Sequence, residues 1–157
     1  MAIGNSIPPA LQRLTPFVGT WHTTGTVVAT SAAYTATDIY EWLPGGHFLV
    51  HRWDAQMPDG RSQGIEIIGP DAPDGADGSD DAARGHYTMH SFDSTGKADT
   101  MRAIVDGKQV AFDGSGVRFR GAFNGNGTEM TGTWSLRAEG SSQDWEPWMT
   151  VVLRRSN

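Results

Sequence analysis

Turn-forming residues divide almost the whole of this 157-residue chain into short segments, and this spacing constrains the fold more than any other feature. From Gly19 onward, segments rich in β-branched and aromatic residues alternate with turns such as Pro58-Asp59-Gly60 and Asn124-Gly125-Asn126-Gly127. No segment offers the long helix that a parallel crossover needs. The sequence therefore predicts an all-β protein with antiparallel, up-and-down strands. The expected strands cover 19–30, 33–43, 47–57, 61–69, 85–92, 97–105, 108–113, 116–123, 127–138 and 143–154.

So many strands must protect their edges, and closing the sheet into a barrel of about ten strands removes the edges altogether. A barrel of about eight to ten strands is wide enough to hold one small ligand. Before the first strand, residues 8–17 place Leu11 and Leu14 three positions apart and reach Pro16 soon afterwards. This pattern predicts a short helix that covers one end of the barrel. We expect residues 1–157 to form a single domain.

A hairpin within residues 38–54 predicts which side chains share a face of the sheet. Gly45 and Gly46 supply the positive φ angles of a tight turn. Counting outward from them places Tyr40 opposite His51, and directly opposed residues lie on the same face. This face combines large rings with an imidazole, a phenol and a carboxylate, so we expect it to line a pocket. Its residues are Asp38, Tyr40, Trp42, Leu49, His51 and Trp53.

Three residues of this face are candidates for chemistry, namely His51, Asp38 and Tyr40. In a dry pocket they could form a general acid/base pair. The favoured interpretation is a hydrogen-bonded polar network that orients a ligand or satisfies buried groups. His86 and His90 lie about 13 Å apart on one strand, which is too far to share a metal ion. The spaced aspartates of residues 70–85 suggest calcium, but they lack the EF-hand spacing with its closing glutamate, so a solvated loop is favoured and we expect no metal site.

The expected ligand-binding residues combine rings, which supply stacking area, with polar groups that fix orientation. Between residues 116 and 123, Arg118 and Arg120 alternate with Phe119. We expect these arginines on a solvated face, although in the lumen they would hold a ligand carboxylate. The expected ligand-binding set is Tyr40, Trp42, His51, Trp53, Glu66, His90 and Trp148.

Composition excludes several classes of function. The chain has no cysteine, which removes disulfides, thiol nucleophiles and thiolate metal sites. Its formal net charge of −6 argues against nucleic acid and against an anionic membrane surface as partners. No apolar run approaches the length of about 20 residues that spans a bilayer, and no signal-peptide pattern opens the chain. A cytoplasmic location is therefore expected, and the oligomeric state stays open, a homodimer included. Residues 70–85 are rich in aspartate and predict a long, exposed acidic loop.

Three motifs carry a resemblance to a known family. They are Gly19-Thr20-Trp21 after the short helix, the hairpin at 42–49 and the ending at 145–155. In order, they resemble nitrobindins and related bacterial calycin (lipocalin-like) domains. The resemblance implies a calycin-like barrel of about ten strands with an internal hydrophobic cavity. It also implies that Trp21 closes the floor of the barrel beneath the helix.

The resemblance also bears on haem. In nitrobindins a histidine on the last strand ligates the haem iron, and here Trp148 stands at that position. The indole nitrogen of tryptophan is only a donor and cannot ligate iron. We therefore expect no cofactor, haem included.

Together these observations favour a barrel that binds a small hydrophobic or aromatic molecule, such as a polyketide-like compound, in its lumen. One alternative is a cofactor-independent isomerase or cyclase, in which the barrel folds a reactive substrate and His51 or Asp38 moves a proton. A haem-binding, nitrobindin-like protein is a weaker alternative that rests on the resemblance alone.

Overall fold

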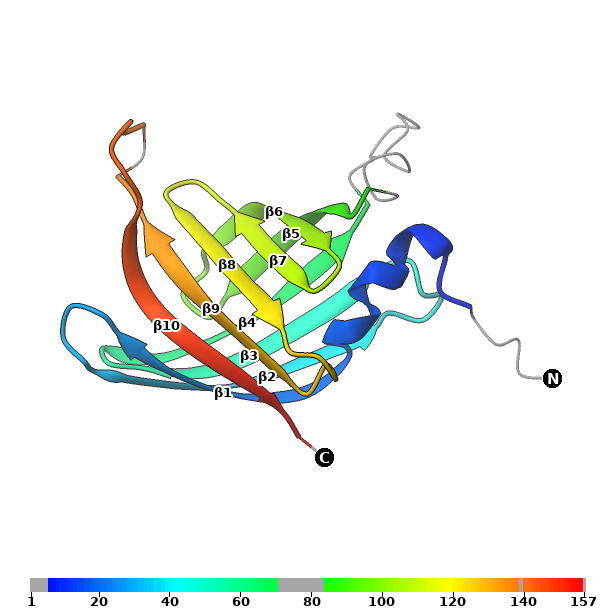
Figure 1. The fold of residues 1–157 in the computed structure, drawn as a ribbon, viewed down its shortest axis with the longest axis horizontal. Helices are drawn as coiled ribbons and strands as arrows, with labels where there is room; N and C mark the ends of the chain where they lie inside the picture. Colours follow the sequence, from blue (N-terminus) through cyan, green and yellow to red (C-terminus); the bar gives the residue numbers. More distant parts are fainter. Residues whose placement is uncertain (1–5, 71–83, 139, 157) are drawn as a thin grey trace.

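Ten antiparallel strands close into a barrel in the computed structural model, which describes residues 6–70, 84–138 and 140–156 (Figure 1). Each strand pairs with its neighbours in sequence, and the first strand pairs with the last to close the barrel. The predicted all-β, up-and-down barrel is confirmed, with strand ends that differ from the expected ones by a few residues. The strands are β1 (Gly19–Val27), β2 (Ala33–Trp42), β3 (Leu49–Met57), β4 (Gly60–Gly69), β5 (His86–Asp93), β6 (Ala98–Asp106), β7 (Gln109–Asp113), β8 (Val117–Phe123), β9 (Glu129–Leu136) and β10 (Glu146–Arg155).

The β2–β3 hairpin has the register that its glycines predict. Gly45 and Gly46 adopt φ angles of 103° and 73°, which only glycine enters at little cost. Beyond the turn, Tyr40 lies opposite His51 and Asp38 lies opposite Trp53. The hairpin therefore places a histidine, a tyrosine, a tryptophan and an aspartate on one wall of the barrel.

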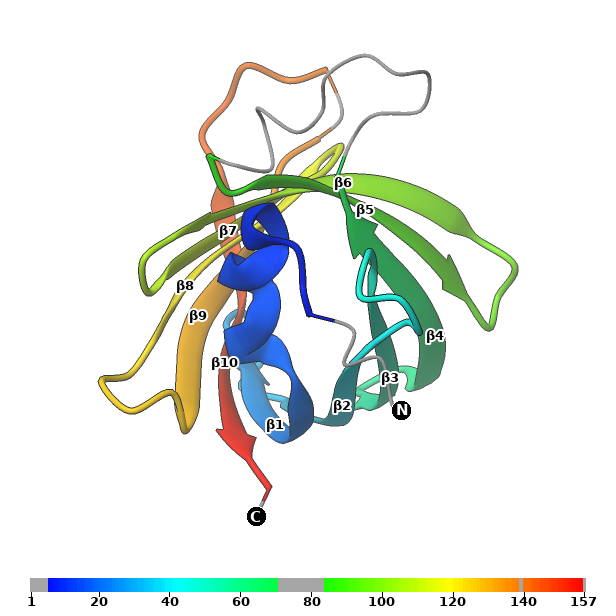
Figure 2. The same ribbon diagram turned by 90° about the vertical axis from the view of Figure 1, so that its right-hand side faces the viewer.

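A 3₁₀ helix, η1 (Pro9–Phe17), precedes β1 and lies across one end of the barrel (Figure 2). Its side chains Leu11, Leu14 and Phe17 are buried in the core, as the spacing of the two leucines predicts. The indole of Trp21 lies beneath the helix and donates a hydrogen bond of 2.8 Å to the carbonyl oxygen of Phe17. The guanidinium of Arg155 stacks over the Trp21 ring and donates to the carbonyl oxygen of Pro16 at 2.6 Å. The helix is thus fixed to the first and last strands, and this end of the barrel is filled.

Two further expectations concern the acidic segment and the absence of membrane-spanning helices. Most of the acidic segment expected at 70–85 lies outside the described residues. Within the described part of the chain, no helix has the length and apolar character needed to cross a membrane.

Candidate ligand-binding cavity

A cavity of about 380 Å³ occupies the half of the barrel away from the helix. At its floor, the rings of Tyr40 and Phe112 meet Phe17 of the helix, with ring centroids 5.3 Å and 6.3 Å from that of Phe17. Its mouth lies at the opposite end, where Asp99 near the start of β6 has a side chain that is 55% exposed. The helix therefore closes one end of the barrel and leaves the other end for entry.

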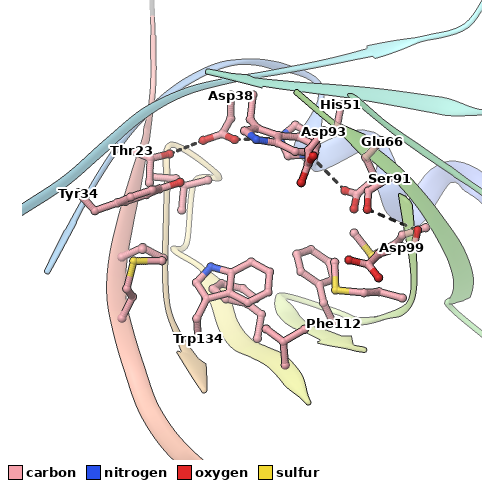
Figure 3. Close-up of a pocket in the computed structure, with 18 of the residues that line it drawn as sticks. Thr23, Tyr34, Asp38, His51, Glu66, Ser91, Asp93, Asp99, Phe112 and Trp134 are labelled. Carbon is pink, nitrogen blue, oxygen red and sulfur yellow. Dashed lines mark hydrogen bonds and ion pairs between the residues drawn. The ribbon is translucent and has the colours of Figure 1, made fainter. Parts of the chain in front are cut away.

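A cluster of three polar side chains lies across this cavity from a pair of aromatic rings (Figure 3). On one side lie Asp38, His51 and Glu66, and on the other lie Phe112 and Trp134. The described lining contains no lysine or arginine. The aromatic and methionine residues of the lining are Tyr34, Tyr40, Trp53, Met57, Met89, Met101, Phe112, Phe119, Met130, Trp134, Trp148 and Met149. Its polar residues are Thr23, Asp38, His51, Glu66, Ser91, Asp93 and Asp99.

His51 lies between two carboxylates in the polar cluster. Strand register places it opposite Tyr40 on β2 and opposite Glu66 on β4. Its Nε2 is 2.8 Å from Oδ1 of Asp38, and its Nδ1 is 3.2 Å from Oε1 of Glu66. Thr23 donates its hydroxyl to the other oxygen of Asp38 at 2.5 Å. Since a carboxylate only accepts hydrogen bonds, this arrangement fits an imidazolium that donates from both ring nitrogens.

The two carboxylates also set the protonation state of His51. Burial lowers the pKa of the imidazole, but the hydrogen bonds and charges of Asp38 and Glu66 outweigh it and raise the pKa from 6.5 to about 9. At neutral pH the histidine is therefore a cation. The three side chains together then carry one net negative charge.

Tyr40 covers His51 and presents a hydroxyl to the cavity. The two rings are stacked, with centroids 4.1 Å apart and an interplanar angle of 1°. Burial, together with the charges of Asp38 and Glu66, raises the pKa of the phenol well above its usual value. Tyr40 therefore stays protonated, and its hydroxyl has no hydrogen-bond partner among the described residues.

The structure brings together most, but not all, of the residues expected to bind a ligand. Trp42 is not among the lining residues, because it packs, partly buried, against the core at the filled end of the barrel. His90 is exposed, since the alternation along β5 turns the more apolar Tyr87 and Met89 inward. The expected residues that line the cavity are Tyr40, His51, Trp53, Glu66 and Trp148.

A β-bulge explains why Trp148 lines the cavity beside its neighbour Met149. Adjacent residues of a regular strand point to opposite faces. Here the pairing of β10 with β9 shifts register between Pro147 and Met149, which allows both side chains to reach the lumen. Further along β10, Val151 and Leu153 continue the inward face.

The arginines of β8 lie outside the lumen, as expected. Arg120 pairs with Asp113 at 2.8 Å, and the guanidinium of Arg118 lies 4.6 Å from the ring centroid of Trp145. Neither arginine lines the cavity, so neither is placed to hold a ligand carboxylate there.

Sequence reasoning missed the rings of the wall opposite His51. Trp134 contacts Phe119 and Phe112, with centroids 5.1 Å and 6.2 Å from its own. These residues come from β7, β8 and β9, so only closure of the barrel brings them to face the hairpin. Tyr34 was also missed, although alternation from Asp38 along β2 would have placed it on the inward face.

No histidine of the described lining has a ring nitrogen free of hydrogen bonds for a haem iron. Trp148 stands where the family resemblance implies the ligand, and indole nitrogen is only a donor. His51 is the one histidine of the described lining, and carboxylates engage both of its ring nitrogens. A histidine–iron bond would require breaking one of these hydrogen bonds and removing a proton.

Comparison with known proteins supports the fold. No protein-family model matches the chain, and no curated protein matches it. Among solved structures it is similar to Rv2717c from M. tuberculosis, with 17% identity, a TM-score of 0.63, and coverage of 97% of this chain and 100% of that chain. At this identity the similarity concerns the barrel alone, and the resemblance to nitrobindins stays a prediction.

Proposed function

We propose that this protein binds a small hydrophobic or aromatic molecule inside its barrel, without haem, in the cytoplasm. The observation that carries the proposal is the cavity of about 380 Å³, which is lined mainly by rings and methionines and has the cluster of Asp38, His51 and Glu66 across from Phe112 and Trp134. Small-molecule sites in proteins are usually concave and mostly apolar, with a few polar groups that fix orientation.

The side chains opposite His51 suit an aromatic or otherwise apolar body. Trp134 offers an aromatic ring for stacking, supported from behind by the buried Phe119, and such stacking adds to the gain from burying apolar area. Methionine side chains are unbranched and polarizable, so Met89 and Met130 can adapt to the outline of a ligand. Specific orientation would come from the polar cluster.

A second candidate function, proton transfer in an isomerase or cyclase, draws support from the buried arrangement of Asp38, His51 and Glu66. A pKa of about 9 makes His51 a poor base at neutral pH, because the ring already holds both protons. In such an enzyme, Glu66 would accept the proton and Tyr40 would donate one. We rank binding above catalysis, because catalysis would also require a substrate that holds its reacting proton within reach of Glu66 or Tyr40.

Tryptophan emission tests the binding proposal directly, since Trp53, Trp134 and Trp148 line the cavity. We would titrate the protein with a panel of neutral aromatic alcohols headed by 4-phenylbutanol, whose single ring absorbs little at tryptophan excitation wavelengths. The expected result is a saturable change in emission that Trp134→Phe reduces. Trp42→Phe is the matched control, because this ring lies outside the lining, and it should leave the change intact.

Absence of a saturable change with every neutral, cationic and anionic aromatic probe tested would overturn the proposal. Recovery of the bound compound separates the two candidate functions. A ligand recovered unchanged supports binding, whereas a rearranged product that Glu66→Gln abolishes supports the enzyme.

A further inference from the structure

Glu66 has a carboxylate oxygen without a partner at the cavity wall. The residue is only 4% exposed, and its Oε1 accepts from His51 at 3.2 Å. Its Oε2 makes no hydrogen bond to another described residue and is not sealed from the cavity. By contrast, Asp38 uses both oxygens, one for His51 and one for Thr23. Buried polar groups are nearly always hydrogen-bonded, so Oε2 of Glu66 is an acceptor that the ligand should fill.

The charges around the cavity favour a ligand whose hydrogen-bond donor to Glu66 is positively charged. The carboxylates of the described lining are those of Asp38, Glu66, Asp93 and Asp99, and His51 is the one basic side chain. Lys97 pairs with Asp99 at 3.2 Å, but its side chain is 69% exposed at the mouth. A cleft lined by charges of one sign concentrates ligands of the opposite sign and disfavours like charge. A carboxylate ligand would therefore be repelled, and an ammonium group attracted.

The ring of Trp53 adds a second attraction for a cation. Trp53 lines the cavity and its ring centroid lies 5.6 Å from that of His51, whereas Tyr40 is already stacked on the imidazole and packed against Phe17. The hydroxyl of Tyr40, without a partner among the described residues, also faces the cavity. The face of an aromatic ring attracts ammonium groups, most strongly where water is excluded.

We infer that the ligand is a hydrophobic or aromatic amine whose ammonium group binds Oε2 of Glu66, while its apolar body packs against Phe112 and Trp134 on the opposite wall. This inference rests on the proposed function and names the chemical class of its ligand. In this inference Glu66 recognises the positive charge of the ligand, and the rings of Phe112 and Trp134 recognise the shape of its apolar body.

Three probes with one body and different head groups test the inference in the wild-type protein. They are 4-phenylbutylamine, 4-phenylbutanol and 4-phenylbutyrate, which are cationic, neutral and anionic at neutral pH. The amine should bind about tenfold more tightly than the alcohol, as expected for one hydrogen bond between charged groups, and the carboxylate should bind most weakly. Calorimetry or tryptophan emission measures the three dissociation constants.

A matched pair of variants locates the effect. Glu66→Gln keeps the size of the side chain and removes its charge, and it should weaken amine binding about tenfold and alcohol binding by a clearly smaller factor. Glu41→Gln makes the same change on the exposed face of β2, where Glu41 pairs with Arg52, and it should change neither. Circular dichroism would establish that each variant is folded.

The possible results separate the two proposals. Equal binding of all three probes, or tightest binding of the carboxylate, would overturn the amine inference and leave the binding function standing. Equal weakening of amine and alcohol in Glu66→Gln would also count against the inference. Absence of binding by every probe would overturn the binding function itself. If Glu66→Gln does not fold, the ratio of amine to alcohol affinity in the wild type decides.

Discussion

The protonated His51 should make the stability of this barrel depend on pH in a defined window. The pKa of its side chain rises from 6.5 to about 9 on folding, because the hydrogen bonds and charges of Asp38 and Glu66 outweigh the cost of burial. A group with a raised pKa in the folded state contributes stability that is fully present below its unfolded pKa and is lost as the pH rises through its folded pKa. At about 1.36 kcal/mol for each pKa unit, the change from 6.5 to about 9 corresponds to about 3 kcal/mol. This contribution should be complete at pH 6 and absent at pH 10.

Urea denaturation of the wild type and of His51→Gln at pH 6 and pH 10 measures this contribution. Other titrating groups affect both proteins, so the difference between their free energies of unfolding isolates His51. The difference should shrink by about 3 kcal/mol between the two pH values. In parallel, NMR should show the imidazole carbons of His51 titrating near pH 9. Parallel pH profiles for the two proteins, or an imidazole that titrates near 6.5, would refute the account of a histidine held protonated by two carboxylates.

Two further substitutions test contacts that shape the cavity and fix the helix. A Cβ added at Gly64 would lie 2.1 Å from Cζ2 of Trp53, so Gly64→Ala should cost about 1–3 kcal/mol in urea denaturation and shift tryptophan emission. An unchanged emission spectrum would show that the Trp53 ring does not cover this glycine. Tyr87→Phe removes the hydrogen bond of 2.7 Å to the carbonyl oxygen of Ala10 and should cost about 1 kcal/mol of unfolding free energy. An equally stable Tyr87→Phe variant would contradict this role in fixing η1.

The part of the site that the sequence predicts is the part that one local turn determines. The positive φ angles of Gly45 and Gly46 fix the register of β2 with β3, and from this register Asp38, Tyr40 and His51 share a face. Chemistry within the hairpin is therefore readable from a few adjacent residues. The face of the hairpin that carries the aromatic rings turns toward the lumen, because burying its larger apolar area is more favourable.

Other parts of the site follow from a second turn or depend on contacts that no turn specifies. The pairing of His51 with Glu66 follows from the β3–β4 turn, where Met57 lies opposite Gly60, and counting from that turn would have found it. For His90, alternation alone left two faces to choose between, and the apolar area of the Tyr87 and Met89 face decided the outcome. Trp42 lies on the predicted face but at the end that the helix fills, which is a tertiary effect.

The separation of charge between the two surfaces of the barrel explains why net charge alone says little about the ligand. On the outer surface, arginines neutralise neighbouring acids in the pairs Arg52–Glu41, Arg61–Asp54 and Arg120–Asp113. On the inner surface, the carboxylates of Asp38 and Glu66 share the single charge of His51. Exposed ion pairs are screened by water, whereas buried charges such as those of Asp38 and Glu66 act on a ligand through a medium of lower dielectric. The uncompensated charge that a ligand meets is therefore set by a few inward side chains. The same barrel fold can be kept while these inward side chains differ. Similarity to a solved structure at 17% identity therefore does not identify the ligand of this protein. Ligand recognition in this chain should be tested at Glu66.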